Sequence, residues 1–300
     1  MTIAEAYKTC REIARREAKN FYYAFVALPH AKRDAICAVY AFMRHADDLS
    51  DDESLPVEER RVRLMKWLDD WHHAATGGAT DDPVFLALAD AQERFGISME
   101  LLDELVEGTS MDLQRVSMQG QYDTYATFED LYRYCYLVAS VVGLVCIRIF
   151  GYNDARAEKL AEETGIAFQL TNILRDVRED VERRRVYLPL DEMRRHKVSV
   201  EDLAVLPERV TQSQRELLRS IAARAEGYYA SGYALLPLID ADARPALWVL
   251  ITIYHRLLKQ IETSGYEVFA RRASVPSVTK LLILSRGIVQ VAVNRMKVGK

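Results

Sequence analysis

Residues that interrupt regular structure are scarce in this sequence. It contains only 13 Gly and 8 Pro in 300 residues, together about 7% against about 12% in an average protein. Few chain breakers mean few turns per residue, which argues against many short strands and favours long helices. Half of the residues are hydrophobic, so a chain of this length can bury a large core.

An excess of positive charge is also missing. The formal net charge of −4 provides no basic field for nucleic acid, so we expect no nucleic-acid partner. An anionic ligand would therefore need individually placed Arg or Lys side chains, or a bound cation.

Paired cysteines and long apolar runs are absent as well. The four cysteines form no C-x-x-C pair, which predicts buried free thiols in a reducing compartment. The longest uncharged run, 134–147, has 14 residues and is too short to span a bilayer. The amino-terminal segment is charged and lacks the apolar core of a signal peptide. We therefore expect a cytoplasmic protein.

What the sequence does contain is helical periodicity along most of its length. Apolar residues recur every three or four positions, as in the stripe Ile36, Val39, Tyr40 and Met43. Turn signals divide the chain into about ten helices with short connections, and none resembles a linker between domains. Thr127-Phe-Glu-Asp and Ser199-Val-Glu-Asp are typical of capped helix starts. The sequence predicts an all-α fold in one domain, 1–300.

The first acidic cluster follows that stripe. Asp47 and Asp51 are i,i+4 neighbours, as are Asp48 and Asp52, and like charges at this spacing destabilise a helix. The carboxyl end of a helix also disfavours anions. A bound cation would relieve both penalties, and Mg²⁺ prefers carboxylate oxygens. The alternative interpretation is a solvated acidic helix end.

The second cluster lies in an apolar surround. Gln169, Asn172, Asp176 and Asp180 follow at steps of three, four and four, so they share one helix face. Polar groups on an inward face are costly unless they are satisfied. We therefore interpret this row as the opposing half of a metal site. The arginines that flank the row can hold phosphate oxygens. The alternative is a surface helix with alternating charges.

These two segments resemble the signatures of the squalene/phytoene synthase family. The matching text is Tyr40-Ala-Phe-Met-Arg44-His-Ala-Asp-Asp-Leu-Ser-Asp-Asp, then Gln169-Leu-Thr-Asn-Ile-Leu-Arg-Asp-Val-Arg-Glu-Asp180, then Arg185-Val-Tyr-Leu-Pro. Further likeness at 20–25, 134–143 and 265–272 extends it over nearly the whole chain. The resemblance implies a single helical bundle of the isoprenoid synthase type around a central cavity.

The resemblance also implies roles for individual positions. Metal-bound diphosphate would be held by Asp47, Asp48, Asp51, Asn172, Asp176 and Asp180. Diphosphate oxygens would be held by Arg44, Arg175, Arg185 and Arg271, and Gln169 would line the site. Tyr134 would help to manage the carbocation and the proton lost from it. Phe21, Phe25, Tyr40 and Tyr254 would contact diphosphate and prenyl chains, although core packing explains each aromatic equally well.

The implied reaction is a Mg²⁺-dependent, head-to-head condensation, with Mn²⁺ as a substitute ion. One farnesyl diphosphate ionises, and a second attacks its cation to give presqualene diphosphate, from which squalene or dehydrosqualene can follow. Twenty-carbon geranylgeranyl substrates would instead give phytoene. We favour the fifteen-carbon reaction because 105–113 and 125–151 resemble bacterial hopanoid-pathway enzymes.

Several alternatives stay open at this point. Family members that make squalene use NADPH without a G-x-G-x-x-G motif, so the absence of that motif here leaves NADPH use undecided. An apolar substrate would favour peripheral contact with a membrane. A terpene cyclase also uses an aspartate-rich helix, and a catalytically silent relative could serve as an assembly protein.

Overall fold

Helices form most of the chain, which confirms the all-α prediction. The computed structural model describes residues 1–114 and 122–298, without the side chains of 19, 20, 112, 114, 288 and 290–298. Asn20 and Asp112, within matched segments, thus lie outside the described side chains. The α-helices are α1 (Ile3–Glu17), α2 (Lys19–Val26), α3 (His30–Ser50), α4 (Val57–Ala75), α5 (Pro83–Phe95), α6 (Met99–Gln114), α7 (Phe128–Cys135), α8 (Val141–Phe150), α9 (Arg156–Glu182), α10 (Leu190–Arg195), α11 (Val200–Ala204), α12 (Gln212–Leu235), α13 (Arg244–Thr263) and α14 (Ser277–Val298).

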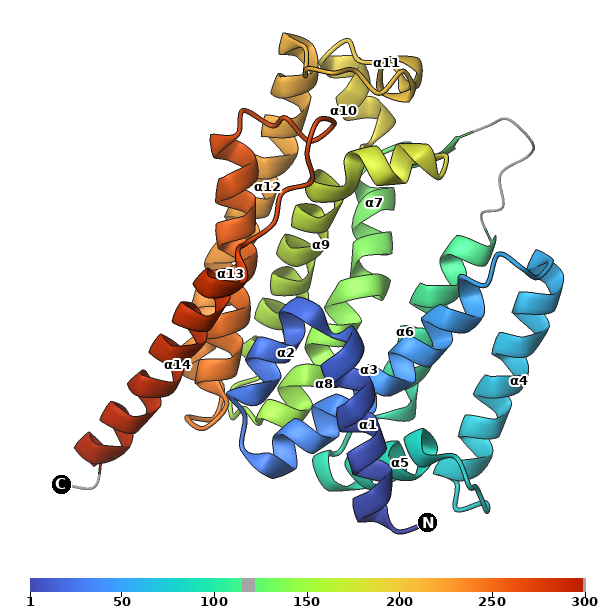
Figure 1. The fold of residues 1–300 in the computed structure, drawn as a ribbon, viewed down its shortest axis with the longest axis vertical. Coiled ribbons are helices and arrows are strands. Elements are labelled where there is room, and N and C mark those ends of the chain that lie inside the picture. Colours follow the sequence, from blue (N-terminus) through green and yellow to red (C-terminus); the bar gives the residue numbers. More distant parts are fainter. Residues whose placement is uncertain (115–121, 299–300) are drawn as a thin grey trace.

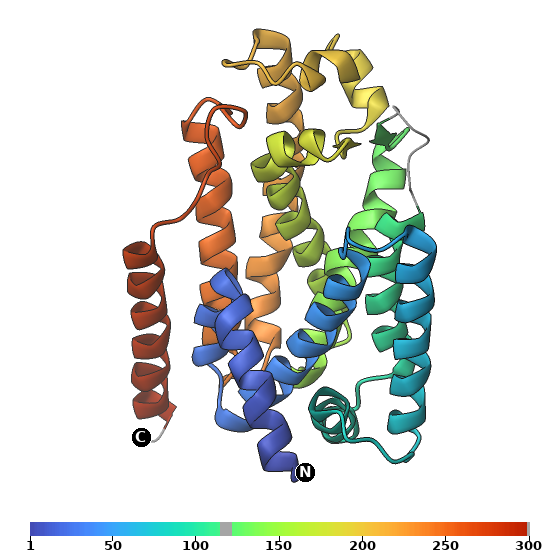
Figure 2. The same cartoon turned by 45° about the vertical axis from the view of Figure 1, so that its right-hand side comes forward.

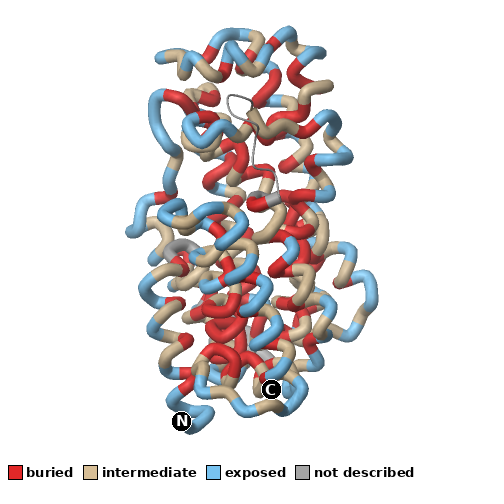
Figure 3. Tube along the Cα trace, turned by 90° about the vertical axis from the view of Figure 1, so that its right-hand side faces the viewer, coloured by how far each residue is buried: buried red, intermediate tan, exposed pale blue. Residues whose placement is uncertain are grey.

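The long helices run roughly along one axis (Figure 1) and enclose an apolar interior. The longest, α9, packs against α12, α13, α7 and α8, and its buried side chains include Ile166, Leu170 and Leu174. Buried residues follow the middle of the bundle, and exposed residues lie on its outside (Figure 3). The described residues therefore form one main core and a smaller apolar cluster between α2, α13 and α14, and the second acidic cluster lies on a helix of the main core.

Local capping agrees with the sequence patterns. Thr127 accepts a hydrogen bond from the backbone N–H of Asp130, whose side chain accepts one from the backbone of Thr127. Ser199 and Asp202 make the same reciprocal pair. Both predicted helix starts are confirmed, and each satisfies two backbone donors that a helix end otherwise leaves without partners.

The small amount of sheet has a definite position. Strand β1 (Asp123–Thr124) pairs in parallel with β2 (Arg185–Val186), so that Asp123 lies opposite Arg185. This pairing ties the segment before α7 to the segment after α9. It fixes the backbone of Arg185 at one end of the α9 acidic row.

Residues 128–150 form one continuous helical stretch, longer than the 14-residue run that the sequence suggested. It consists of α7, a π-helical turn η1 (Tyr136–Ser140) and α8. By length and composition its 23 residues are sufficient to cross a membrane, and half of its most apolar window is buried within the bundle. It packs against α6, α9 and α3, as a core helix does.

Candidate active site

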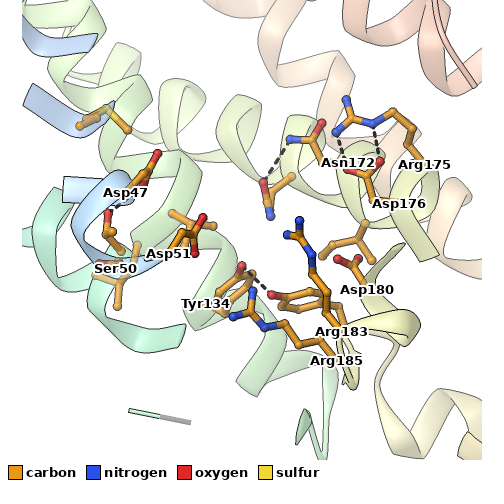
Figure 4. Close-up of a pocket in the computed structure, with 18 of the residues that line it drawn as sticks. Asp47, Ser50, Asp51, Tyr134, Asn172, Arg175, Asp176, Asp180, Arg183 and Arg185 are labelled. Carbon is orange, nitrogen blue, oxygen red and sulfur yellow. Dashed lines mark hydrogen bonds and ion pairs between the residues drawn. The ribbon is translucent and has the colours of Figure 1, made fainter. Parts of the chain in front are cut away.

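The two acidic clusters face each other across one cavity. This cavity of about 520 Å³ is lined by α3, α6, the π-helical turn, α9 and the β2 segment. Asp47 and Asp51 lie on one side, and Asp176 and Asp180 lie on the other (Figure 4). Arg183 and Arg185 lie between them, with Tyr134 nearby. The helix faces expected from the sequence therefore point into a shared space.

On the α3 side, Asp47 is partly buried and electrostatically strained. Thr109 of α6 donates a hydrogen bond to its Oδ1 at 3.3 Å. Burial, and then the neighbouring charge of Asp51, raise the pKa of Asp47 to about 7, although Arg44 opposes the shift. A carboxylate held in this way gains from a nearby cation. Asp51 is exposed and caps the carboxyl end of α3.

Two of the residues predicted for this site do not line the cavity. Asp48 is exposed and pairs with Arg44 one turn earlier on α3. Asp48 is rotated by about 100° from Asp47 around the helix, and its ion pair with Arg44 holds it outside the cavity lining. The expected contacts of Asp48 and Arg44 with metal or diphosphate are absent from this arrangement and stay predictions.

On the α9 side, Gln169, Asn172, Asp176 and Asp180 all line the cavity. Asn172 Nδ2 donates a hydrogen bond to Gln169 Oε1 at 3.3 Å. The Oδ1 atom of Asn172 is buried and has no hydrogen-bond partner. A buried acceptor without a donor is costly, so this oxygen is suited to a ligand that enters the cavity.

Two arginines hold the carboxylate of Asp176. Arg175 donates from Nε to Asp176 Oδ1 at 2.7 Å and from its terminal nitrogen to Oδ2. Arg272 also donates to Oδ1, at 2.8 Å, and lies 3.3 Å from Glu179. Arg271, which the resemblance had indicated, is exposed and lines neither cavity described here. The structure thus brings Arg272, rather than its neighbour, to the acidic row.

Three tyrosine rings form a cluster beside the carboxylates. Tyr134 and Tyr187 stack with ring centroids 5.0 Å apart, and the Tyr134 hydroxyl donates to the Tyr187 hydroxyl at 3.2 Å. Tyr125 lies 5.4 Å and 5.8 Å from the two rings. Such rings exclude water and present negative π faces, which attract a cation.

Close helix packing fixes the position of this cluster. A Cβ atom on Gly165 of α9 would lie 2.6 Å from the Ser140 Cα, and one on Gly108 of α6 would lie 2.7 Å from the Leu137 carbonyl oxygen. Both contacts are with the π-helical turn that follows Tyr134. Such turns widen a helix locally and are frequent at functional sites. Backbone contacts on two sides leave Tyr134 little freedom to move.

A second cavity of about 560 Å³ adjoins the first, and Asn172 and Arg175 line both. Phe21, Tyr40 and Tyr254 line it, as expected of contacts with a prenyl chain. Phe25 is not part of its lining and packs edge-on against Tyr40 at 6.0 Å.

Sequence reasoning did not assign several residues of this site. Tyr125 and Tyr187 follow the paired strands β1 and β2 and come together through tertiary structure, and Thr109 comes from a different helix. Arg183 lies in a run of three arginines, of which the pattern selected only the last. Arg272 lies in a loop, where helical spacing gives no information. The sequence did contain two signals for these residues: the run of arginines at 183–185, and the family-like segment 185–189, which includes Tyr187.

A helical bundle that opposes carboxylates and arginines across a cavity with aromatic walls is the arrangement of an isoprenoid synthase. The chain belongs to the squalene/phytoene synthase family, whose sequence profile matches residues 14–279. It is therefore a prenyltransferase of the kind that joins isoprenoid units head to head.

Named relatives agree with this assignment. The chain is 35% identical to 15-cis-phytoene synthase of Synechocystis over 94% of its own length and 84% of the relative. It is also 35% identical to phytoene synthase of Mycobacterium tuberculosis, over 93% and 89% of the two chains.

Two solved structures show the same fold. A dehydrosqualene synthase with a bound ligand superposes with a TM-score of 0.84 at 30% identity, over 97% of this chain and 98% of that one. A squalene synthase of Alicyclobacillus acidocaldarius superposes with a TM-score of 0.79 at 27% identity, over 88% and 95%. Each of these relatives is named as a synthase, which favours the enzyme over the assembly-protein alternative.

Proposed function

We propose that the chain condenses two identical isoprenoid diphosphates head to head, with the diphosphates held between α3 and α9. The observation that carries this proposal is that Asp47 and Asp51 face Asp176 and Asp180 across one cavity.

The donor set fits Mg²⁺ that is bound together with a substrate. In the described part of the chain, no group of three or more His, Cys, Asp or Glu side chains converges closely enough to hold an ion by itself. Mg²⁺ usually takes one or two protein carboxylates and completes its shell with phosphate oxygens and water. Asp47 and Asp51 would supply one side, and Asp176, Asp180 and the unpartnered Asn172 Oδ1 the other.

Bound there, Mg²⁺, or Mn²⁺ in its place, would neutralise the diphosphate as it leaves. The side chains around the cavity have complementary tasks. Arg183 and Arg185, which lie between the two acidic pairs, would orient diphosphate oxygens. The Tyr134 and Tyr187 rings would keep water away from the allylic cation. The Tyr134 hydroxyl, next to that of Tyr187, would guide the departing proton.

Two adjoining cavities suit a reaction of two substrates. Asn172 and Arg175 line both, so the reactive ends of two prenyl diphosphates could meet beside these residues. The aromatic lining of the second cavity, from Phe21, Tyr40 and Tyr254, would hold a hydrocarbon chain. Holding two reactants together in this way removes much of the entropic barrier to their condensation.

Two substrate lengths have specific support. The fifteen-carbon reaction, to presqualene diphosphate and then squalene or dehydrosqualene, is supported by the likeness to dehydrosqualene and squalene synthase structures. The twenty-carbon reaction, to phytoene, is supported at least as well, because the similar sequences are named phytoene synthases. NADPH would be needed only for squalene. We propose that the reaction takes place in the cytoplasm or at its membrane surface.

The test is incubation of the purified protein with labelled fifteen- or twenty-carbon diphosphate, in Mg²⁺ or in EDTA, with and without NADPH. We expect pyrophosphate release and a thirty- or forty-carbon product only when Mg²⁺ is present. An Asp176→Asn variant should lose the product, and the matched control Asp69→Asn, on the exposed face of α4, should keep it. If neither substrate releases pyrophosphate, the proposal is wrong.

A further inference from the structure

The last helix exposes an unusual amount of apolar surface. Among the described residues, ten large hydrophobic side chains are exposed, and four of them lie on α14: Val278 (69% exposed), Leu281 (54%), Leu282 (59%) and Val289 (59%). Scattered single hydrophobics are normal on a surface, whereas a contiguous group marks an interaction site.

The spacing shows that these four residues form one stripe. Positions 278, 281, 282 and 289 lie within about 100° of arc on a helix of 3.6 residues per turn. The opposite face is packed, since Ile283 is buried against Val249 and Ile253 of α13. A Cβ atom on Gly287 would lie only 2.8 Å from the Val249 side chain. The helix therefore docks on α13 through one face and presents a second apolar face to solvent. Figure 2 shows α14 at the edge of the bundle, beside α13.

The charge of this segment is opposite to that of the rest of the protein. Residues 277–300 contain Lys280, Arg286, Arg295, Lys297 and Lys300 and no Asp or Glu, so they carry +5. The whole chain carries −4, which leaves −9 on residues 1–276. An anionic surface would thus attract this helix and repel the remainder, which fixes the orientation of approach.

The position of α14 connects this surface to the proposed active site. Ser277 and Lys280, in its first turn, line the second cavity together with Arg272 and Val275 of the preceding loop. Phe21 and Tyr254 lie in the same lining. A surface that binds the outer face of α14 would therefore lie close to a cavity suited to a prenyl chain.

We propose that α14 is an interfacial helix that docks the protein on an anionic lipid membrane and brings the second cavity to the bilayer surface. Leu281, Leu282 and the rest of the stripe insert among the acyl chains, while the positive charge of the segment attracts acidic headgroups. Delivery of a membrane-dissolved isoprenoid diphosphate into that cavity rests on the function proposed above, whereas the docking itself does not.

The test compares vesicle binding by the full chain and by two matched variants. The probe is co-flotation with vesicles of phosphatidylcholine alone or mixed with phosphatidylglycerol, at low and high salt. The wild-type chain should bind the anionic vesicles, and binding should weaken with salt. Leu281→Glu/Leu282→Glu should weaken binding by about tenfold or more. The control Val62→Glu/Met65→Glu, which changes two equally exposed residues of α4, should bind as wild type does.

Three results would overturn the proposal. They are failure of the wild-type chain to bind anionic vesicles, equal binding by the α14 variant, and equal loss in the α4 control. The other candidate partner for this stripe is a second copy of the chain. Light scattering tests it by measuring the oligomeric state. If the α14 variant turns a dimer into a monomer and vesicles are not bound, the stripe is an interface between two copies.

Measurements of turnover distinguish a failure of the docking proposal from a failure of the proposed function. With detergent-dispersed substrate, the α14 variant should match wild type, and with vesicle-embedded substrate it should be slower. Absence of turnover from the wild-type chain in both formats would overturn the proposed function and leave docking to be judged by flotation alone. Equal rates in vesicles, from a variant that has lost binding, would refute delivery from the membrane.

Discussion

Replacing Asp47 with Asn should stabilise the protein in the absence of divalent ions. Burial and the charge of Asp51 raise the pKa of Asp47 from 3.8 to about 7 in the folded chain. The folded state therefore binds more protons than the unfolded state between about pH 4 and pH 7, so this group makes stability fall as pH rises through that window. The neutral amide of Asn removes that dependence, and its Oδ1 can still accept the hydrogen bond from Thr109.

The size of the effect follows from the pKa shift. A shift of about three units corresponds to about 4 kcal/mol at pH 8, and screening of this partly exposed carboxylate reduces it to about 2 kcal/mol. A chain of this size gains about 2 °C in Tm per kcal/mol. We thus expect Asp47→Asn to raise Tm by about 4 °C at pH 8 in EDTA, and by much less near pH 4, where the folded state is protonated and the unfolded state is only partly ionised.

The assay is thermal unfolding in EDTA at pH 8 and pH 4, for wild type and two variants. Asp52→Asn is the control, because hydrogen bonds from Ser54 lower the pKa of Asp52. Loss of that charge should therefore not raise Tm. A lower Tm for Asp47→Asn at pH 8, or an equal gain at both pH values, would refute the reasoning. Mg²⁺ with pyrophosphate should raise the Tm of wild type more than that of Asp47→Asn.

Three further predictions concern the site and its support. Asp176→Asn should reduce product formation at least about 100-fold while the far-ultraviolet circular dichroism stays unchanged; retained turnover would argue against a role in ionisation. Tyr134→Phe should lower kcat about 10-fold or more with little change in KM, and unchanged kcat would exclude its hydroxyl from proton handling. Gly165→Ala, which meets the Ser140 backbone, should destabilise by about 1–3 kcal/mol in thermal unfolding. Gly227→Ala, with open space around it, should stabilise by about 0.5–1 kcal/mol; equal effects would refute the packing argument.

The helices and the members of each acidic row could be predicted from the sequence because those features are local. Helical periodicity places Asp47 and Asp51 on one face, and the α9 row follows from steps of three and four. That the two faces meet is a tertiary fact. Periodicity carries no information about it, and it was indicated only by the polar row in an apolar surround and by the likeness to a family.

The differences between the predicted site residues and the cavity lining have equally physical causes. Asp48 belongs to the same acidic string as Asp47, but it lies about 100° away around the helix and pairs with Arg44. Helical spacing leaves both residues as candidates, because Asp51 lies within one turn of each, and only the structure shows that Asp48 lies outside the cavity lining. Arg271 and Arg272 lie in a loop, where no periodicity decides which side chain turns toward Asp176. The π-helical turn after Tyr134 packs closely against Gly108 and Gly165, and such contacts between helices cannot be read from the sequence of that turn alone.

The two sides of the cavity balance their charge in different ways, and this difference bears on how a divalent ion would bind. On α3, the raised pKa means that Asp47 holds a proton for part of the time near neutral pH. On α9, the negative charge of Asp176 is already balanced by Arg175 and Arg272. Binding of an ion with diphosphate would therefore release a proton on one side and free arginine donors on the other. Those donors would lie beside the incoming phosphate oxygens, so ordering of the substrate and relief of the strained carboxylate would occur together.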